Sequence, residues 1–418
     1  MDNYKKMFVM LSLGFGSGLP YILLISTSTA WLRDINVDLS YIGFFTWITF
    51  AYTFKFAWAP FVDRFSIPFL ARLGHRKSWI AFMQIIIFVS LLTISNINPL
   101  ENFILFCIVG SIVAFAGSVQ DIAIDAFRIE YAHISDQGNL AASYQLGYRL
   151  AIIAATSLAL IFADVNGWSS TFKLMAGLMC LGLLGIIFSK EEENTELGKL
   201  NFRNSIFEPL KDFISRFGLF MASILLLIIA TYRLTDIVMG PMATPFYIDM
   251  GFTLTEIGAV VKIIALFASI FGIFFGGLLI KRLKIFKSLF IGAFLVMITN
   301  ILFAYVAIAE KSITLLAIIV AMDSLAAGIV GTVNIAFLTS LVSKKYTGFQ
   351  YALLTGFMAG PGFALKGLSG LWADYLQEIF GFEYGWMGFY ITTSLLTVPS
   401  ILLLFGYRNF LINHEKTI

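Results

Sequence analysis

The sequence predicts an all-α polytopic membrane protein of about twelve transmembrane helices, because it is too apolar for a soluble fold and its apolar residues form long runs. Of the 418 residues, 59% are hydrophobic and 13% are charged, and the mean hydropathy is +0.87. Soluble domains contain about 45–50% apolar residues. The excess must therefore face lipid, and the formal net charge of +3 is no sign of a nucleic-acid partner.

Apolar runs of about 20 residues, the length that a helix needs to cross a bilayer, recur along the whole chain. The first run follows Lys5 and Lys6 but is too long for the apolar part of a secretory signal, so we expect it to be the first helix. Cys107 and Cys180 lie in such runs and are expected to be packing residues. The predicted helices lie near 7–32, 40–60, 79–98, 102–127, 138–163, 168–189, 218–247, 254–280, 287–309, 312–342, 350–378 and 385–406.

The basic residues of the predicted loops and ends fall almost entirely on one side of the membrane. Only Arg33 and Lys311 lie in loops on the other side. Because Lys and Arg are enriched in cytoplasmic loops, this distribution predicts that both termini are cytoplasmic.

A polar segment divides the predicted helices into two groups of six. It spans 191–217 and predicts a cytoplasmic linker between a bundle at 1–190 and a second bundle at 218–418. The segment 34–43 recurs at 249–258 with four of ten residues identical, each time where the second helix of a half begins. Two parallel six-helix repeats are typical of the major facilitator superfamily, in which the substrate site lies between the halves. We therefore expect that fold.

Several short motifs carry a more specific resemblance, which is strongest over about the first 150 residues. They are Leu13-Gly-Phe-Gly-Ser-Gly-Leu-Pro20, Ala30-Trp-Leu32, Tyr52-Thr-Phe-Lys-Phe-Ala-Trp-Ala-Pro60 with Asp63-Arg64, Gln120-Asp-Ile-Ala-Ile-Asp-Ala126 and Tyr144-Gln-Leu-Gly-Tyr-Arg149. Phe246-Tyr-Ile-Asp-Met-Gly-Phe252, Glu256-Ile-Gly258 and Lys262 extend the pattern into the second half. With these motifs the sequence resembles the AmpG-type muropeptide permeases of Gram-negative inner membranes.

The resemblance implies a secondary transporter that imports anhydromuropeptides, fragments of peptidoglycan, together with protons across the cell inner membrane. It implies a small anionic glycopeptide as cargo and a proton gradient in place of a cofactor. The scaffold is not tied to one cargo, so another organic anion or a CoA-type metabolite remains an alternative, as does a non-transporting sensor. We expect a monomer, although the sequence leaves the oligomeric state open.

Neither an enzyme nor an ATP-driven pump is expected. The sequence has no Gly-x-x-x-x-Gly-Lys-Ser/Thr loop that would cradle the phosphates of ATP. Its three histidines, His75, His133 and His414, lie in predicted cytoplasmic loops or the tail, which leaves no intramembrane histidine as a general base and no histidine cluster for a metal ion.

Charged residues inside the predicted helices are the candidates for substrate binding, because an ionisable group in the membrane usually faces a partner or a wet cavity. The midplane carries more cations than anions, which favours an anionic cargo. Alternatively, Arg233 and Asp236, spaced i to i+3, simply neutralise each other, and the neighbouring aromatic and amide groups serve helix packing. The candidates are Gln120, Tyr144, Gln145, Arg149, Tyr232, Arg233, Asp236, Lys262, Asp323 and Lys366.

Asp121 and Asp125 are four residues apart and therefore share one face of the predicted fourth helix. Two carboxylates this close interact, and one that retains its proton would suit a proton-coupling site. Lys55 lies at a similar depth. The alternative is a charge lock of the cytoplasmic gate, formed by these three residues with Asp63, Arg64 and Arg128. The sequence leaves both alternatives open.

Overall fold

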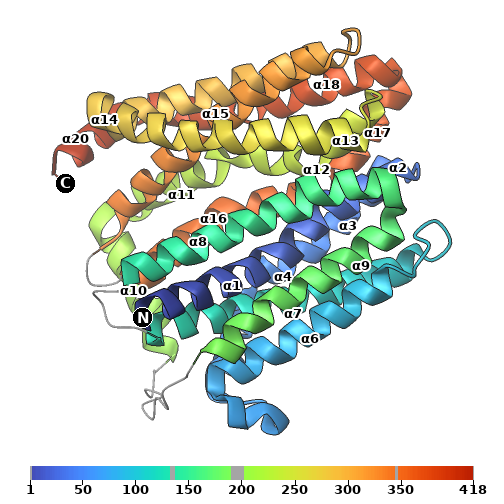
Figure 1. Ribbon diagram of the computed structural model, residues 1–418. Helices are drawn as coiled ribbons and strands as arrows, with labels where there is room; N and C mark the ends of the chain where they lie inside the picture. The colour runs from blue at the N-terminus through green and yellow to red at the C-terminus, as the bar shows by residue number, and fades with distance from the viewer. Residues whose placement is uncertain (1, 132–136, 190–201, 344–346, 418) are drawn as a thin grey trace. The chain divides into compact units, whose positions relative to one another are not determined.

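The computed structural model describes residues 2–131, 137–189, 202–343 and 347–417, and within these ranges every regular element is a helix (Figure 1). Among the described residues, eight helical segments are long and apolar enough to cross a membrane. They are Tyr4–Asp34, His75–Ile94, Phe103–Arg128, Ser143–Phe188, Leu219–Asp249, Leu254–Val306, Ile313–Leu341 and Phe382–Gly406. The predicted all-α membrane fold is confirmed.

Two of these segments are too long for one crossing, and each contains a residue with positive φ. Gly167 (φ 75°) interrupts Ser143–Phe188, and Lys284 (φ 66°) interrupts Leu254–Val306. At both residues φ and ψ lie outside the α-helical region, so each site ends one helix and starts the next. The segments therefore contain two helices each, in agreement with the predicted loops near these positions.

Three predicted helices are broken rather than continuous. The helix expected at 40–60 is a succession of short α and 3₁₀ pieces. The helix expected at 218–247 is interrupted at Arg233, which has a non-helical ψ of 11°. The helix expected at 350–378 is interrupted after Lys366. With these interrupted helices included, the structure is compatible with twelve crossings.

Contacts divide the chain into two compact units. Unit 1 contains Met1–Val37, Phe45–Gly198 and Thr253–Ala259, and unit 2 contains Asp38–Phe44, Lys199–Phe252 and Val260–Ile418. A short segment of each half of the sequence thus belongs to the unit that is formed mainly by the other half.

Unit 1 is built mainly from long helices that pack side by side. A Cβ atom at Gly14 would overlap the carbonyl oxygen of Tyr144, and one at Gly147 would overlap that of Leu11. These glycines allow the backbones of α1 and α8 to approach closely (Figure 1). The helices of this unit are α1 (Asp2–Ile22), η1 (Leu23–Thr27), α2 (Ser28–Asp34), η2 (Thr46–Thr49), α4 (Phe50–Thr53), η3 (Lys55–Ala57), α5 (Ala59–Arg64), η4 (Pro68–Leu73), α6 (His75–Ile94), α7 (Phe103–Glu130), α8 (Gln137–Ile153), η6 (Ala154–Leu158) and α9 (Ala159–Phe188).

Unit 2 has a core of apolar side chains that includes a cluster of aromatic rings. The rings of Phe246, Phe303 and Tyr390 lie 4.8–6.4 Å apart and pack against Trp386. Its helices are α10 (Phe202–Phe217), α11 (Leu219–Tyr232), α12 (Leu234–Asp249), α14 (Lys262–Val306), α15 (Ile313–Leu341), α16 (Thr347–Lys366), α17 (Ser369–Phe380), α18 (Phe382–Leu395), α19 (Val398–Gly406) and α20 (Arg408–Thr417). The short helices α3 (Leu39–Phe45), α13 (Leu254–Glu256) and η7 (Ile257–Val261) include the segments that the two halves exchange.

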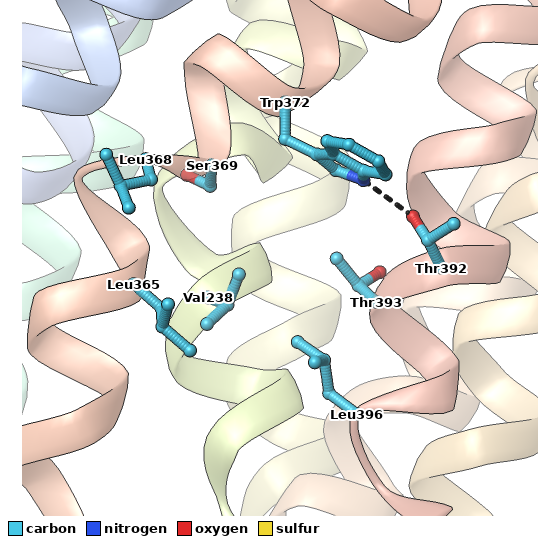
Figure 2. Close-up of a pocket in the computed structure, with 8 residues that line it drawn as sticks. All are labelled: Val238, Leu365, Leu368, Ser369, Trp372, Thr392, Thr393 and Leu396. Atoms are coloured by element: carbon cyan, nitrogen blue, oxygen red, sulfur yellow. Dashed lines mark hydrogen bonds between the residues drawn. The ribbon is translucent and has the colours of Figure 1, made fainter.

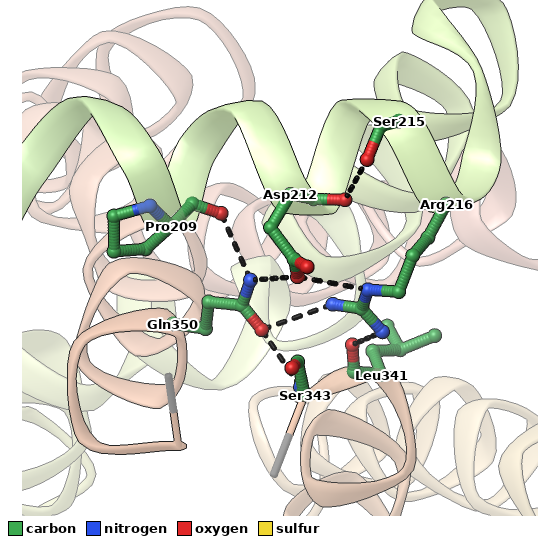
Figure 3. A network of polar contacts seen from close by, with 7 residues as sticks. All are labelled: Pro209, Asp212, Ser215, Arg216, Leu341, Ser343 and Gln350. Atoms are coloured by element: carbon green, nitrogen blue, oxygen red, sulfur yellow. Dashed lines mark hydrogen bonds and ion pairs between the residues drawn. The ribbon is translucent and has the colours of Figure 1, made fainter. Parts of the chain in front are cut away.

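The predicted linker contains the amphipathic helix α10, which is fastened to α15 and α16 by a polar network (Figure 3). The buried amide of Gln350 accepts from Arg216 at 2.9 Å and donates to the carbonyl oxygen of Pro209 at 2.8 Å and to Asp212 at 2.9 Å. Arg216 also donates to the carbonyl oxygen of Leu341 at 3.0 Å. The last part of the linker is therefore an ordered part of unit 2.

Candidate functional site

Asp121 on α7 is hydrogen-bonded inside unit 1 to a residue of α1. Ser17 Oγ donates to Asp121 Oδ1 at 2.5 Å and lies 2.8 Å from the hydroxyl oxygen of Tyr144 on α8. Ser17 is 1% exposed and Tyr144 is 9% exposed. The close approach of α1 and α8 places these two hydroxyls beside the carboxylate. Three helices thus meet at one carboxyl group.

The direction of these hydrogen bonds follows from the number of protons available. A serine hydroxyl carries one hydrogen, and an ionised carboxylate only accepts. If Ser17 donates to Asp121, the hydroxyl of Tyr144 must donate to Ser17. A proton on Asp121 would remove the negative charge to which Ser17 donates and would add an O–H donor beside the two hydroxyls. The carboxyl group of Asp121 is thus part of a row of hydrogen bonds that includes residues of α1 and α8.

Asp125 has a different environment, although it lies one turn further along the same helix. Its Oδ2 lies 3.9 Å from Nζ of Lys55, and its Oδ1 lies 3.7 Å from a guanidinium nitrogen of Arg128. Its side chain is 45% exposed. The guanidinium of Arg128 also lies over the ring of Tyr144, 5.6 Å from its centroid. Asp125 is thus the centre of a partly exposed charge cluster, whereas Asp121 accepts a hydrogen bond from the hydroxyl of Ser17.

Arg149 and Gln145 lie on α8, with Gln145 exposed and Arg149 partly exposed. Within the part of the chain that the structure describes, the guanidinium of Arg149 forms neither an ion pair nor a hydrogen bond. A cation in a membrane-spanning helix is costly without an anion or water.

The charged candidates of unit 2 have protein partners. Arg233 and Asp236 form the predicted ion pair, with 3.5 Å between the guanidinium and Oδ2. Lys262 donates to Thr244 at 2.9 Å, and Asp323 accepts from Thr299 at 2.8 Å.

Lys366 is 3% exposed, and its Nζ lies 3.8 Å from the centroid of the Phe363 ring. The cation–π contact offsets part of the cost of burying this ammonium group.

Two predicted binding residues are buried and form contacts between helices. Gln120 is fully buried and donates from Nε2 to the carbonyl oxygen of Gly16 at 2.9 Å. Tyr232 is 3% exposed and donates to the carbonyl oxygen of Leu289 at 3.1 Å. These two hydrogen bonds join helices of one unit. The side chains of Asp63 and Arg64, predicted for the cytoplasmic gate, lie outside the described residues.

Comparison with known proteins gives the family. The model of the Major Facilitator Superfamily matches residues 7–367. The chain belongs to the Major Facilitator Superfamily. It is also 30% identical to the "Putative transporter AmpG 4" of Rickettsia conorii, with 98% of this chain and 97% of the relative covered. It is 31% identical to the "Anhydromuropeptide permease" of Escherichia coli K12, with 96% of this chain and 79% of the relative covered.

Solved structures show the same fold at low sequence identity. A bacterial homologue of the human lysosomal transporter Spinster has a TM-score of 0.74 at 13% identity, covering 98% of both chains. A D-xylose–proton symporter has a TM-score of 0.69 at 13% identity, covering 94% of this chain and 97% of that chain. The predicted superfamily fold and the resemblance to AmpG-type permeases are confirmed. This member of the superfamily is a membrane transporter of a small molecule and not an enzyme.

Several partners of the charged candidate residues could not be predicted from the sequence. Ser17 lies in the motif Gly16-Ser-Gly18, which in the sequence indicates only the family resemblance. No sequence feature marks Thr244 and Thr299 as partners of charged residues, because a threonine in an apolar helix commonly bonds its own backbone. No feature of the sequence pairs Ser17 with Asp121, which lies 104 residues away.

Unit 2 also contains a cavity of about 250 Å³ that is lined mainly by apolar side chains (Figure 2). Trp372 borders it and donates its indole N–H to Thr392 at 2.9 Å. The lining residues are Val238, Leu365, Leu368, Ser369, Trp372, Thr392, Thr393 and Leu396. None of them is charged, so the cavity does not suit the head of an anionic cargo.

Proposed function

We propose that this transporter imports anhydromuropeptides together with protons across the inner membrane. The similarity over 96% of this chain to a protein named as an anhydromuropeptide permease supports this cargo. The bias of basic residues in the sequence supports cytoplasmic termini. The two-bundle division at residues 1–190 and 218–418, and a monomeric state, remain part of the proposal.

Asp121 is the proposed proton carrier. The observation that carries this assignment is the hydrogen bond from Ser17, together with the contact between Ser17 and Tyr144. Proton binding at Asp121 removes a negative charge and reorganises hydrogen bonds that join three helices. A proton carrier needs such a link between protonation and helix contacts. Proton binding can drive transport only if it stabilises one conformation of the protein relative to another.

Asp125 is proposed as the centre of a gate. Its ion contacts with Lys55 and Arg128 are long, at 3.9 and 3.7 Å, and its side chain is 45% exposed. Exposed pairs of this kind contribute only about 0–1 kcal/mol each, so they can break and re-form during a transport cycle. Asp63 and Arg64 remain candidates for the same gate on sequence grounds alone.

Arg149, with Gln145 beside it, is the proposed contact for a carboxylate of the cargo. Guanidinium groups bind carboxylates through two parallel hydrogen bonds, and amides bind hydroxyl or amide groups of a glycopeptide. In unit 2, Lys262 and Lys366 are proposed as further cationic contacts, and Arg233, Asp236 and Asp323 as polar contacts. Each of these would have to exchange a protein partner for the cargo.

The test compares Asp121→Asn with Asp125→Asn in proteoliposomes with an imposed pH gradient. For Asp121→Asn we expect loss of gradient-driven accumulation of labelled anhydromuropeptide, with exchange of cargo across the membrane retained. For Asp125→Asn we expect slower transport that still responds to the gradient. Accumulation by Asp121→Asn in response to the gradient would refute the coupling assignment. Accumulation of labelled acetyl-CoA, with none of labelled muropeptide, would show that the cargo is a CoA-type metabolite.

A further inference from the structure

The repeated segments 34–43 and 249–258 begin with equivalent structural contacts. Asp34 accepts a hydrogen bond from the indole N–H of Trp168 at 2.7 Å, within unit 1. Asp249 accepts one from the indole N–H of Trp386 at 2.9 Å, within unit 2. The first residue of each repeat is therefore anchored to a tryptophan in its own half of the sequence.

The seventh residue of each repeat is bonded in an equivalent way by an aspartate that is distant in the sequence. Ser40 donates both its backbone N–H (2.7 Å) and its hydroxyl (2.6 Å) to Asp374 Oδ2. Thr255 donates its backbone N–H (3.2 Å) and its hydroxyl (2.5 Å) to Asp164 Oδ2. Ser40 and Thr255 are each the second residue of a short helix, α3 or α13, whose first N–H groups have no partner within the helix. In both cases one carboxylate oxygen accepts both donors.

The tenth residue is a glycine that permits close packing at the same place. A Cβ atom at Gly43 would lie 2.6 Å from the carbonyl oxygen of Gly367, which precedes Asp374 by seven residues. A Cβ atom at Gly258 would lie 2.9 Å from the carbonyl oxygen of Ser157, which precedes Asp164 by seven residues. The two arrangements therefore match in side chains, in hydrogen bonds and in spacing.

These contacts explain why each segment is part of the unit formed mainly by the other half. Asp38–Phe44 belongs to unit 2, whereas the residues on both sides of it belong to unit 1. Thr253–Ala259 belongs to unit 1 and is flanked by residues of unit 2. Asp374 and Asp164 supply the polar contacts that hold these two segments.

We propose that Asp164 and Asp374 are paired positioning residues for translocation, which hold α13 and α3 in one state of the transport cycle and release them together in the other. The bonds suit this role. The Asp164–Thr255 contact is solvent-exposed and the Asp374–Ser40 contact is only partly buried, so water can replace the carboxylate when a segment leaves. The two contacts are equivalent, and the loss of one is expected to weaken the other, because both favour the same state.

The experiment measures a distance between two exposed residues next to one contact. Tyr41 and Tyr375 are 54% and 51% exposed. Both are replaced by cysteine and spin-labelled in the full chain, with Cys107 and Cys180 changed to Ala. Double electron–electron resonance in nanodiscs then gives the populations of short and long distances. It needs neither cargo nor a proton gradient, so its result is independent of the proposed function.

Asp374→Ala is expected to raise the ratio of long to short distances about threefold or more, the effect of losing a hydrogen bond. Asp164→Ala is expected to shift the same Tyr41–Tyr375 ratio in the same direction, although Asp164 bonds a different segment. Asp374→Asn and Asp164→Asn retain an acceptor oxygen and are expected to stay near the parent ratio. Each variant is also checked for correct folding by its monodisperse elution in size-exclusion chromatography.

Two outcomes would overturn the proposal. If Asp164→Ala leaves the Tyr41–Tyr375 populations unchanged while Asp374→Ala shifts them, the two residues are local structural contacts and are not paired. If the Asn variants shift the populations as much as the Ala variants, the accepting oxygen is not what holds the segments.

Discussion

Ser17 Oγ bridges Asp121 and Tyr144, at 2.5 Å from the carboxylate oxygen and 2.8 Å from the phenolic oxygen. The bridge joins α1, α7 and α8 through one hydroxyl group. Ser17 therefore links the carboxyl group of Asp121 to residues of two other helices. This relationship is the basis of the coupling assignment.

Ser17→Ala removes the donor to Asp121 and the acceptor for Tyr144. We expect gradient-driven accumulation of cargo to fall about tenfold, the effect of losing a hydrogen bond near the upper end of the usual range. Uptake is measured in proteoliposomes across a range of imposed pH gradients. Ser111→Ala is the matched control, because the Ser111 hydroxyl donates only to the carbonyl oxygen of Cys107 on its own helix. Equal uptake by both variants would contradict the role of the bridge.

Exchanging the charges of Lys55 and Asp125 tests the gate. Lys55→Asp and Asp125→Lys alone each place like charges together, and we expect each to slow transport about fivefold or more. The double variant restores an opposite pair and is expected to recover most of the rate. Initial rates of uptake are compared with thermal unfolding of the purified variants. Because the two side chains are 43% and 45% exposed, unfolding should change little. If the double variant transports no faster than either single variant, the contact between Lys55 and Asp125 does not control the transport rate.

Arg149→Gln tests the contact with an anionic cargo. Removing one partner of a charge-paired contact typically costs about 2–5 kcal/mol, so we expect KM to rise about 30-fold or more with a smaller change in the maximal rate. The expected difference shrinks for a cargo whose carboxylates are amidated. Lys173→Gln serves as the control, since Lys173 is an exposed cation on α9 outside the candidate set. A similar loss for charged and amidated cargo would show that Arg149 does not bind a carboxylate.

Gln350→Ala tests the attachment of α10. The substitution removes bonds to Pro209, Asp212, Arg216 and the backbone N–H of Ser343 (Figure 3). We expect the free energy of unfolding to fall by about 2 kcal/mol, because buried partners lose their bonds. Denaturant unfolding in detergent is the measurement. Ser215→Ala should have little effect, since Ser215 bonds only the carbonyl oxygen of Asp212 within α10. Identical unfolding midpoints for both variants would show that the network does not stabilise the protein.

The sequence predicted the helices well because lipid imposes a simple length and hydropathy rule on each crossing. The interruption at Arg233 was not predicted, since local sequence gives little sign of where tertiary contacts unwind a helix. The helix α10 was assigned to a polar linker, because its charges concealed an amphipathic pattern whose apolar face packs on unit 2.

The candidate site was predicted in part. The spacing of Asp121 and Asp125 identified both carboxylates, and Arg233 and Asp236 form the expected pair. The different roles proposed for the two carboxylates depend on Ser17, which lies 104 residues from Asp121. The partners Ser40 and Asp374 lie 334 residues apart. A single sequence gives no contact information at such separations, although the repeat did identify the position of Ser40 as a structural equivalent of Thr255.

The most direct test of the account is uptake of labelled anhydromuropeptide by the purified protein in proteoliposomes. An inward proton gradient is imposed, and the same vesicles with the gradient collapsed serve as the reference. We predict accumulation above the external concentration that disappears when the gradient is removed. Absence of muropeptide accumulation under the gradient, in vesicles whose protein is folded and correctly inserted, would contradict proton-driven import of this cargo.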